Sequence, residues 1–519
     1  MVAYSRILVV LIYLVFTIFI SYLVNKKTSN RGDFSTGGKQ FGWLTVGVSI
    51  LATYISAMTF VGMPGWVYSD GMQAIAIHLN YPIVIFFSVV FFIPIFYKLG
   101  LTSIYEYLEH RFGVITRTIN SLVFIVVQCI TSGIILYAVS LILVRILPIS
   151  VEEAIIYISL FTALYTYAGG ISTVIWTDVM QSGFLLAGCV AIFVTLVMSL
   201  PDLGALPELS SAVAAKLSMA NLSTSFGDDT TLMAGLIAVS FLHLSVYGSN
   251  QLIIQRTLAT RSVETAQKSM LVCGYGAFFV YLFFSLMGVL LFVFYQGQPF
   301  ENSNDVILDF VFNHTHPLIV GLIMAALSAA AMSTLDSSYN SMATVATFDI
   351  YKRFIKPDKD NIHYEKVARR LSLSCAMLVV IPAMLAISNE SVLKSIASLT
   401  SIFVGIRLGS FLLGIFSRSS NEAGIIAASI ASILAILLCQ SAGVAWPWYA
   451  PAGTVVFIAT GLIVSRLIGQ TTASQLAFFE QQKSLYHAPT TSQYMLLVFA
   501  AFTVLTCFFL PSLLAKVLF

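Results

Sequence analysis

The residues best suited to bind an ion lie in one apolar stretch, from Gly321 to Ser341, which is long enough to cross a bilayer. Small and hydroxyl side chains recur in it at the i, i+3, i+4 spacing that places residues on one helix face. These residues are Ala330, Ser333, Thr334, Ser337 and Ser341. Asp336 adds an ionisable group, which costs on the order of 3 kcal/mol in the middle of a membrane helix. Close helix packing also explains the small residues, whereas the aspartate favours a path for a cation.

The composition of the chain indicates a polytopic helical membrane protein. Of its 519 residues, 58% are hydrophobic and only 9% are charged, and apolar runs of about 20 residues recur from end to end. The net charge of +3 is too small to argue for a nucleic-acid partner. The six cysteines stand singly in apolar runs without CxxC spacing. They are therefore interpreted as small core residues, neither a disulfide framework nor a metal site.

Fourteen membrane-spanning helices are predicted. The first runs from Arg6 to Asn25, and the basic stretch that follows it predicts an uncleaved anchor with that end in the cytoplasm. The other apolar runs lie at about 41–67, 71–97, 118–147, 152–169, 172–200, 229–254, 267–296, 317–350, 368–388, 391–417, 421–441, 447–467 and 491–515. Alternation then gathers the basic residues in cytoplasmic loops, as the positive-inside rule requires. These residues are Lys98, Arg111, Arg117, Arg256, Arg261, Lys268 and those between Lys352 and Arg370. We expect a multi-pass protein of the cell membrane with both termini outside.

Two of these helices carry interruptions in their middles. The segment from Val46 to Pro64 mixes small, β-branched and hydroxyl residues before Gly62 and Pro64, and the segment from Phe241 to Gln251 contains Gly248-Ser-Asn. Local unwinding would free backbone carbonyl groups to face a cation. Because the two helices lie five positions apart in helix order, they predict an inverted five-plus-five repeat.

The motifs of other function classes are missing from the sequence. It contains no HExxH, no GxSxG with triad partners, no paired histidines at ligand spacing and no Walker motif. An enzyme or a primary pump is therefore not expected. A secondary transporter is expected, and a transporter-like solute sensor is the alternative, although no appended output domain is visible.

One longer motif carries a resemblance to a known family. Tyr165 to Gln181 reads Tyr-Thr-Tyr-Ala-Gly-Gly-Ile-Ser-Thr-Val-Ile-Trp-Thr-Asp-Val-Met-Gln and resembles the signature of the sodium/solute symporter family. Further matching stretches follow in family order. They are Ile55–Gly62, Thr102–Phe112, Ile254–Ala259, Ser333–Ser341 and Phe411–Gly414. The pattern is most similar to sialic-acid and sugar-type members.

The resemblance implies an all-α fold with a leucine-transporter-like core of ten helices and a protein that works as a monomer. Residues 1–40 would then form an extra helix and a basic loop, 41–200 the first repeat, 201–418 an outer loop and the second repeat, and 419–519 three peripheral helices.

The resemblance also implies two cation sites. In the family's main sodium site, backbone oxygens of the first core helix meet hydroxyl groups of the eighth. The matching residues here are Ala52, Ile55, Ala330, Ser333 and Thr334. A second site in some members matches Asp178, Ser333, Asp336 and Ser337. Because such relatives have a hydroxyl residue in place of Asp336, three alternatives stay open: a second sodium ion, a proton, or an ion pair with Arg407.

For the solute, the matching positions are Tyr54, Ser56, Thr59, His78, Thr131 and Asn250, and Arg407 is added as a buried cation suited to a carboxylate. His243 has no such match and is interpreted as a structural residue. Sialic-acid relatives have an arginine where this chain has Thr131, and sugar transporters have a lysine and a glutamine where it has Ala277 and Ala397. We therefore expect sodium-coupled uptake of a small polar solute, with a sialic-acid-like or other organic anion favoured and a neutral sugar, polyol or amino acid as alternatives.

Overall fold

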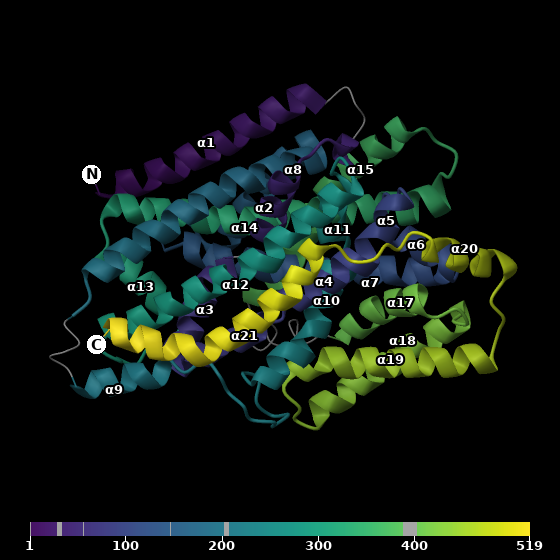
Figure 1. Ribbon diagram of the computed structural model, residues 1–519. Coiled ribbons are helices and arrows are strands. Elements are labelled where there is room, and N and C mark those ends of the chain that lie inside the picture. The colour runs from purple at the N-terminus through teal and green to yellow at the C-terminus, as the bar shows by residue number, and fades with distance from the viewer. Residues whose placement is uncertain are drawn as a thin grey trace.

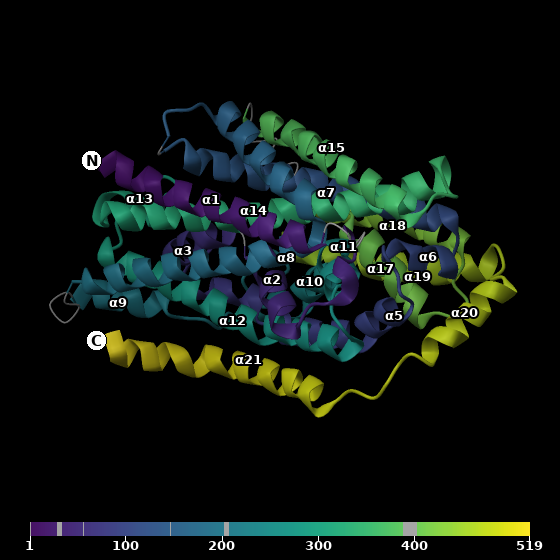
Figure 2. The same ribbon diagram turned by 90° about the horizontal axis from the view of Figure 1, so that it is seen from above.

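The computed structural model describes residues 2–28, 34–55, 57–145, 147–201, 207–387 and 402–518. These residues form a bundle of helices, in which the two termini lie at the same end (Figures 1 and 2). Over the described ranges the one β-bridge joins Phe41 to Thr260. The expected all-α class is thus confirmed.

The described residues form twenty α-helices. In chain order they are α1 (Val2–Thr28), α2 (Trp43–Tyr54), α3 (Ala57–Asp70), α4 (Tyr81–Phe87), α5 (Ile93–Lys98), α6 (Tyr105–Arg111), α7 (Val114–Leu143), α8 (Val151–Met198), α9 (Pro207–Lys216), α10 (Val239–Ser249), α11 (Gln251–Leu258), α12 (Val263–Phe294), α13 (Asp305–His314), α14 (Pro317–Val345), α15 (Asn361–Ile387), α17 (Val404–Phe416), α18 (Glu422–Ser441), α19 (Tyr449–Leu467), α20 (Ala473–Lys483) and α21 (Thr491–Leu518). Shorter 3₁₀ or π segments at Met72–His78, Ser88–Phe92, Ala234–Ala238 and Ala346–Ile355 extend several of them.

The predicted count of fourteen spans is not confirmed by length and composition. Within the described residues, ten helices are long and apolar enough to cross a membrane, or eleven if α10 and α11, bent by 43°, form one span. Two physical reasons lower this count. The pair α2 and α3 and the helix α17 are too short to pass alone, and α8 is one element of 48 residues.

Gly170 divides α8 into two crossings. A straight helix of 48 residues would be ~72 Å long, more than twice the ~30 Å of a hydrocarbon core. The backbone of Gly170 lies at φ 59° and ψ −152°, which breaks the helix there. A Cβ atom on this residue would lie 2.5 Å from the carbonyl oxygen of Phe34, so only glycine fits. The break falls between the predicted spans 152–169 and 172–200.

Both predicted interruptions are present. The first falls at Ile55, where φ is −80° and ψ 91°, between α2 and α3. It precedes Gly62 and Pro64, and Pro64 lies inside α3. The second falls at Asn250, whose backbone is extended between α10 and α11 and whose side chain accepts a hydrogen bond from Leu252 N. The side-chain cap allows α11 to begin at once.

Helix α14 lies at the centre of the bundle, where it contacts α1, α2, α7, α8, α11 and α15 (Figures 1 and 2). Every residue from Ala329 to Val345 is buried. The small side chains of this segment allow six neighbours to approach its backbone closely. Its polar side chains must therefore find partners on other helices.

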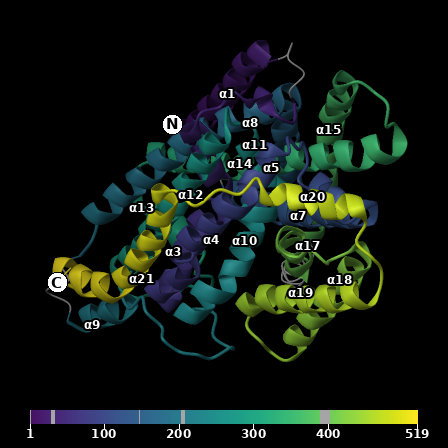
Figure 3. The same ribbon diagram turned by 45° about the vertical axis from the view of Figure 1, so that its right-hand side comes forward.

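Helices α17, α18 and α19 form a group at one side of the bundle (Figure 3). A carboxylate provides one of the attachments between this group and α7. Oε1 of Glu422, the first residue of α18, accepts hydrogen bonds from Ile115 N at 2.9 Å and Thr116 N at 3.0 Å. It thereby satisfies two free N–H groups in the first turn of α7.

Candidate functional site

The break at the end of α2 faces the hydroxyl stripe of α14. Ser333 Oγ lies 3.0 Å from the carbonyl oxygen of Ala330 and 3.4 Å from that of Ala52. Thr334 Oγ1 donates to the carbonyl oxygen of Thr53 at 3.1 Å and lies 3.3 Å from that of Ala330. Five oxygen atoms from two helices therefore converge in a buried place.

The local structure explains why these oxygen atoms are available. The last carbonyl groups of a helix have no partner within it, and α2 ends only two residues after Ala52. Hydroxyl and carbonyl oxygens are the ligands that hard cations prefer in proteins. The structure thus brings together four of the five residues predicted for the main sodium site, Ala52, Ala330, Ser333 and Thr334. The fifth, Ile55, is buried at the break itself.

The two predicted aspartates lie buried on either side of Ser337. Asp178 Oδ2 accepts a hydrogen bond from Ser49 Oγ at 2.5 Å, and its Oδ1 has no hydrogen-bond partner. Asp336 Oδ2 accepts from Tyr165 OH at 2.8 Å, and its Oδ1 lies 3.0 Å from Ser337 Oγ. Ser337 Oγ also donates to the carbonyl oxygen of Ser333. All four residues predicted for the second cation site thus belong to one polar cluster.

Arg256 is a member of this cluster that the sequence analysis missed. The sequence predicts Arg256 in a cytoplasmic loop, but its side chain is 1% exposed and its Nη2 lies 3.1 Å from Asp178 Oδ2. The same guanidinium donates to Ser49 Oγ at 2.9 Å and to Ser337 Oγ. The signal that could have found it is its place two turns after the interruption at Asn250, on a helix that must pack against α14.

Arg407 does not form the ion pair with Asp336 that was one of the three alternatives for this site. Its Nε donates to Ser245 Oγ at 2.7 Å instead. The two residues lie on different helices, α17 and α14, and the buried cation beside the aspartates is Arg256. The alternative that pairs Asp336 with Arg407 is therefore wrong, because the arginine in this cluster is Arg256.

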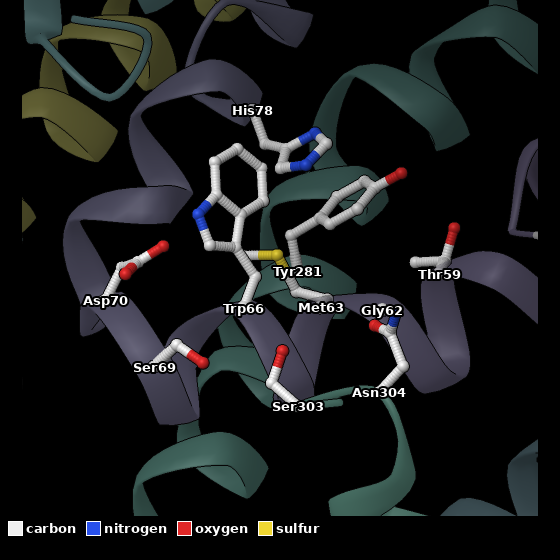
Figure 4. Close-up of a pocket in the computed structure, with 10 residues that line it drawn as sticks. All are labelled: Thr59, Gly62, Met63, Trp66, Ser69, Asp70, His78, Tyr281, Ser303 and Asn304. Carbon is white, nitrogen blue, oxygen red and sulfur yellow. The ribbon is translucent and has the colours of Figure 1, made fainter. Parts of the chain in front are cut away.

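A cavity of about 540 Å³ lies beyond the break, between α3, the segment Met72–His78, α12 and the loop before α13. Its lining residues are Thr59, Gly62, Met63, Trp66, Ser69, Asp70, His78, Tyr281, Ser303 and Asn304. Figure 4 shows the rings of His78 and Tyr281 close to the indole of Trp66, with Ser303 and Asn304 across the space from His78. The cavity therefore offers aromatic surfaces and several polar groups, which suits a small polar solute.

His78 is the buried polar group of this cavity. Its ring stacks on that of Tyr281 with centroids 3.3 Å apart, and its Nδ1 has no hydrogen-bond partner. The side chain is only 8% exposed. A free nitrogen in such a place is available to a solute.

Among the predicted solute residues whose side chains the structure describes, only Thr59 and His78 line the cavity. Thr131 Oγ1 donates to the carbonyl oxygen of Val127 in its own helix, and Asn250 caps α11. Arg407 is bound to Ser245 and is absent from the lining. Ser56 and the side chain of Tyr54 lie outside the described residues.

The missed lining residues include Trp66 and Asp70. They follow Thr59, Gly62 and Met63 at helical spacing, so one face of α3 forms a wall of the cavity. This periodicity was visible in the sequence. The histidine interpreted as structural, His243, is packed in the interior: its Nδ1 lies 2.6 Å from Asn80 Oδ1, and its ring stacks on that of Tyr81.

Comparison with known proteins gives consistent matches. Residues 34–432 match the model of the sodium:solute symporter family. The sodium/sialic acid symporter NanT of Aliivibrio fischeri is 32% identical over 86% of this chain and 89% of its own. The sodium/sialic acid symporter SiaT of Proteus mirabilis is 30% identical over 91% of this chain and 96% of its own.

Solved structures agree with these matches. The substrate-bound, outward-open structure of a Na⁺-coupled sialic acid symporter, in which a novel Na⁺ site was found, has a TM-score of 0.82 at 29% identity. It covers 90% of this chain and 99% of its own. A nucleobase-cation-symport-1 family transporter with bromovinylhydantoin bound has a TM-score of 0.57 at 12% identity and shares the fold alone. The predicted leucine-transporter-like fold class is confirmed.

Proposed function

This chain belongs to the sodium:solute symporter family, and from that premise we propose that it couples the inward movement of sodium to the uptake of a small polar organic solute. A sialic-acid-like anion is the favoured solute, because the relatives NanT and SiaT are sodium/sialic acid symporters. The family is one of transporters and not of enzymes. The chain is accordingly a multi-pass membrane protein.

The observation that carries the proposal is the meeting of the α2 break with α14. Ser333 and Thr334 face the carbonyl groups of Ala52 and Thr53 at 3.1–3.4 Å, and a sodium ion between them would hold the two helices together. The solute cavity lies directly beyond this break on α3. Sodium binding would thereby shape the cavity, and each ligand would raise the affinity of the other by the same factor.

The buried cluster around Ser337 supports a second monovalent cation. With all groups ionised, Asp178 and Asp336 carry two negative charges and Arg256 one positive charge, so one negative charge is unbalanced in a place without solvent. A second sodium ion or a proton would balance it. Asp336→Ser, which restores the hydroxyl of relatives, should change the ratio of charge to solute moved, measured by current and tracer flux together.

Several finer statements belong to the same proposal. We propose that the first repeat covers residues 41–200 and the second 201–418, with residues 1–40 and 419–519 peripheral to them. Both termini would lie outside the cell, and the functional unit would be a monomer. Reaction of a cysteine introduced at an exposed residue of α20 with an impermeant reagent tests the orientation, because α20 should then be cytoplasmic.

The experiment that tests the proposed function is tracer uptake into proteoliposomes. Radiolabelled sialic acid is offered with an inward sodium gradient, and with potassium in its place. We expect accumulation with sodium alone, abolished or weakened in Ser333→Ala. The matched control is Ser341→Ala, two turns further along α14, whose hydroxyl donates to Ser338 O of its own helix. Uptake that ignores the sodium gradient, or binding without any uptake, would overturn the proposal.

A further inference from the structure

Arg256 joins four helices with one side chain. From α11 its Nε donates to Ser49 Oγ of α2, and its Nη2 donates to Asp178 Oδ2 of α8 and to Ser337 Oγ of α14. Its Nη1 donates to Leu252 O in its own helix. A buried guanidinium that makes four hydrogen bonds fixes the relative positions of the groups it touches.

The neighbouring residue strengthens the same junction. Gln255 Nε2 lies 2.9 Å from Asn340 Oδ1 and 3.1 Å from Thr344 Oγ1, both on α14, and 2.8 Å from the carbonyl oxygen of Ser35. Gln255 and Arg256 are 2% and 1% exposed. Two consecutive residues of α11 are thus attached to α14 by polar contacts.

The junction lies on the side of the break opposite the solute cavity. Helix α11 leads from Asn250 to Thr260, whose carbonyl oxygen accepts a hydrogen bond from Tyr97 OH of α5. The cavity is lined by the loop before α13. In Figures 1 and 2, α13 and α9 lie toward the end of the bundle that carries the termini, and α5 and α6 lie toward the other end.

A chain of hydrogen bonds connects Arg256 to the candidate sodium site. The guanidinium donates to Ser337 Oγ, Ser337 Oγ donates to the carbonyl oxygen of Ser333, and Ser333 Oγ reaches the carbonyl oxygen of Ala52. The chain starts at α11, passes along α14 and ends at α2. A cation between α2 and α14 would therefore draw together two of the four helices that Arg256 joins.

We propose that Arg256 is the positioning residue that latches α2 and α11 onto α8 and α14 on the side away from the cavity, and that this latch couples sodium binding to solute binding. The inference rests on the proposed sodium-coupled function. While the latch is closed, sodium entering from the cavity side cannot leave on the other side. The contacts of Arg256 would break in the step in which sodium and solute leave on the side away from the cavity.

The test compares Arg256→Gln with the double variant Asp178→Asn/Arg256→Gln in proteoliposomes. The single variant leaves Asp178 without its cation and should lower thermal stability, whereas the double variant removes both charges and should regain much of it. Both should pass sodium when no solute is present. Both should also lower the factor by which sodium raises solute affinity, which is about 5- to 150-fold in coupled proteins, towards one.

Arg111→Gln is the matched control. Arg111 is equally buried, and its guanidinium donates to the carbonyl oxygens of Gly414, Ser417 and Ser420, far from the sodium site. Its loss should lower stability without a sodium leak. The latch is refuted if the double variant keeps the sodium-to-solute flux ratio of the wild type, or if Arg111→Gln leaks equally. The sodium leak is measured without solute. It therefore tests the role of Arg256 even if the protein transports a solute other than the one proposed.

Discussion

Thr334 provides the sharpest test of the sodium site, because one atom can be removed with little change of shape. Its Oγ1 lies 3.1 Å from the carbonyl oxygen of Thr53 and 3.3 Å from that of Ala330. Thr334→Val replaces the hydroxyl by a methyl group, and Thr334→Ser keeps the oxygen and loses the methyl. Only the valine variant should lose a ligand to sodium.

The expected magnitude follows from the energy of one polar contact to a charge. Such a contact contributes about 1.5–3 kcal/mol, and each 1.4 kcal/mol corresponds to a factor of ten, so Thr334→Val should weaken sodium binding about 10- to 150-fold. Thr334→Ser should stay within about threefold of the wild type, because the loss of one methyl is felt only in packing. The carbonyl group of Thr53 also loses its donor in the valine variant, which lowers stability at every sodium concentration.

The assay must therefore separate sodium affinity from stability. Thermal unfolding of the purified protein is followed against sodium concentration, with potassium added to hold the ionic strength constant. The stabilisation follows the logarithm of one plus the ratio of free sodium to its dissociation constant. The sodium concentration at which stability begins to rise therefore reports the dissociation constant, whatever the starting stability. The same onset concentration for the valine variant, the serine variant and the wild type would refute Thr334 as a ligand.

Three further predictions concern other parts of the molecule. His78→Leu should raise the KM for solute about 2- to 10-fold through loss of one hydrogen bond, while sodium-dependent stabilisation without solute stays unchanged; an unaltered KM would contradict the assignment. Gly235→Ala should lower the melting temperature, since its Cβ atom would lie 2.0 Å from a backbone oxygen. Gly183→Ala, with open space around it, should leave the melting temperature unchanged or raise it. Equal changes in both variants would show that the close backbone contact at Gly235 does not determine stability. Burial opposes the charge of Glu109, but the hydrogen bond and the charge of Arg117 outweigh it and hold the pKa of Glu109 below its ordinary 4.5. Its stabilisation is therefore present above pH 4.5 and lost as the pH falls through the lowered pKa; thermal unfolding of Glu109→Gln across acidic pH should lack this loss, and an identical acid profile would argue against it.

The fold class could be predicted because its signals are local. Apolar length marks the spans, and small or polar residues in the middle of an apolar run mark the breaks at Ile55 and Asn250. The α14 stripe was equally legible, since hydroxyl groups at helical spacing point the same way in any packing. That Ser333 and Thr334 meet carbonyl groups of α2 was implied by the family resemblance and not by the spacing, and the structure has this contact.

The partners of charged residues could not be predicted in the same way. Arg256 reads as a loop cation because it follows an apolar run by only a few residues, yet α11 continues past the break and carries it inward. Whether Arg256 faces solvent or a carboxylate depends on how α2, α8 and α14 pack around it. The sequence near Arg256 does not contain that information. The prediction for Arg407 was wrong for a different reason. Its burial was predicted correctly, but the group that it binds is the hydroxyl of Ser245 and not Asp336.

The contact made by Glu422 has a consequence for any attempt to trim this protein. A chain shortened to the ten-helix core would lose the acceptor for the amides of Ile115 and Thr116. Two N–H groups in the first turn of α7 would then have lost their acceptor. Helix α7 packs against α14, which carries the hydroxyl stripe. Peripheral helices thus contribute to the structure of the transport core. A shortened chain would need another hydrogen-bond acceptor for the first turn of α7.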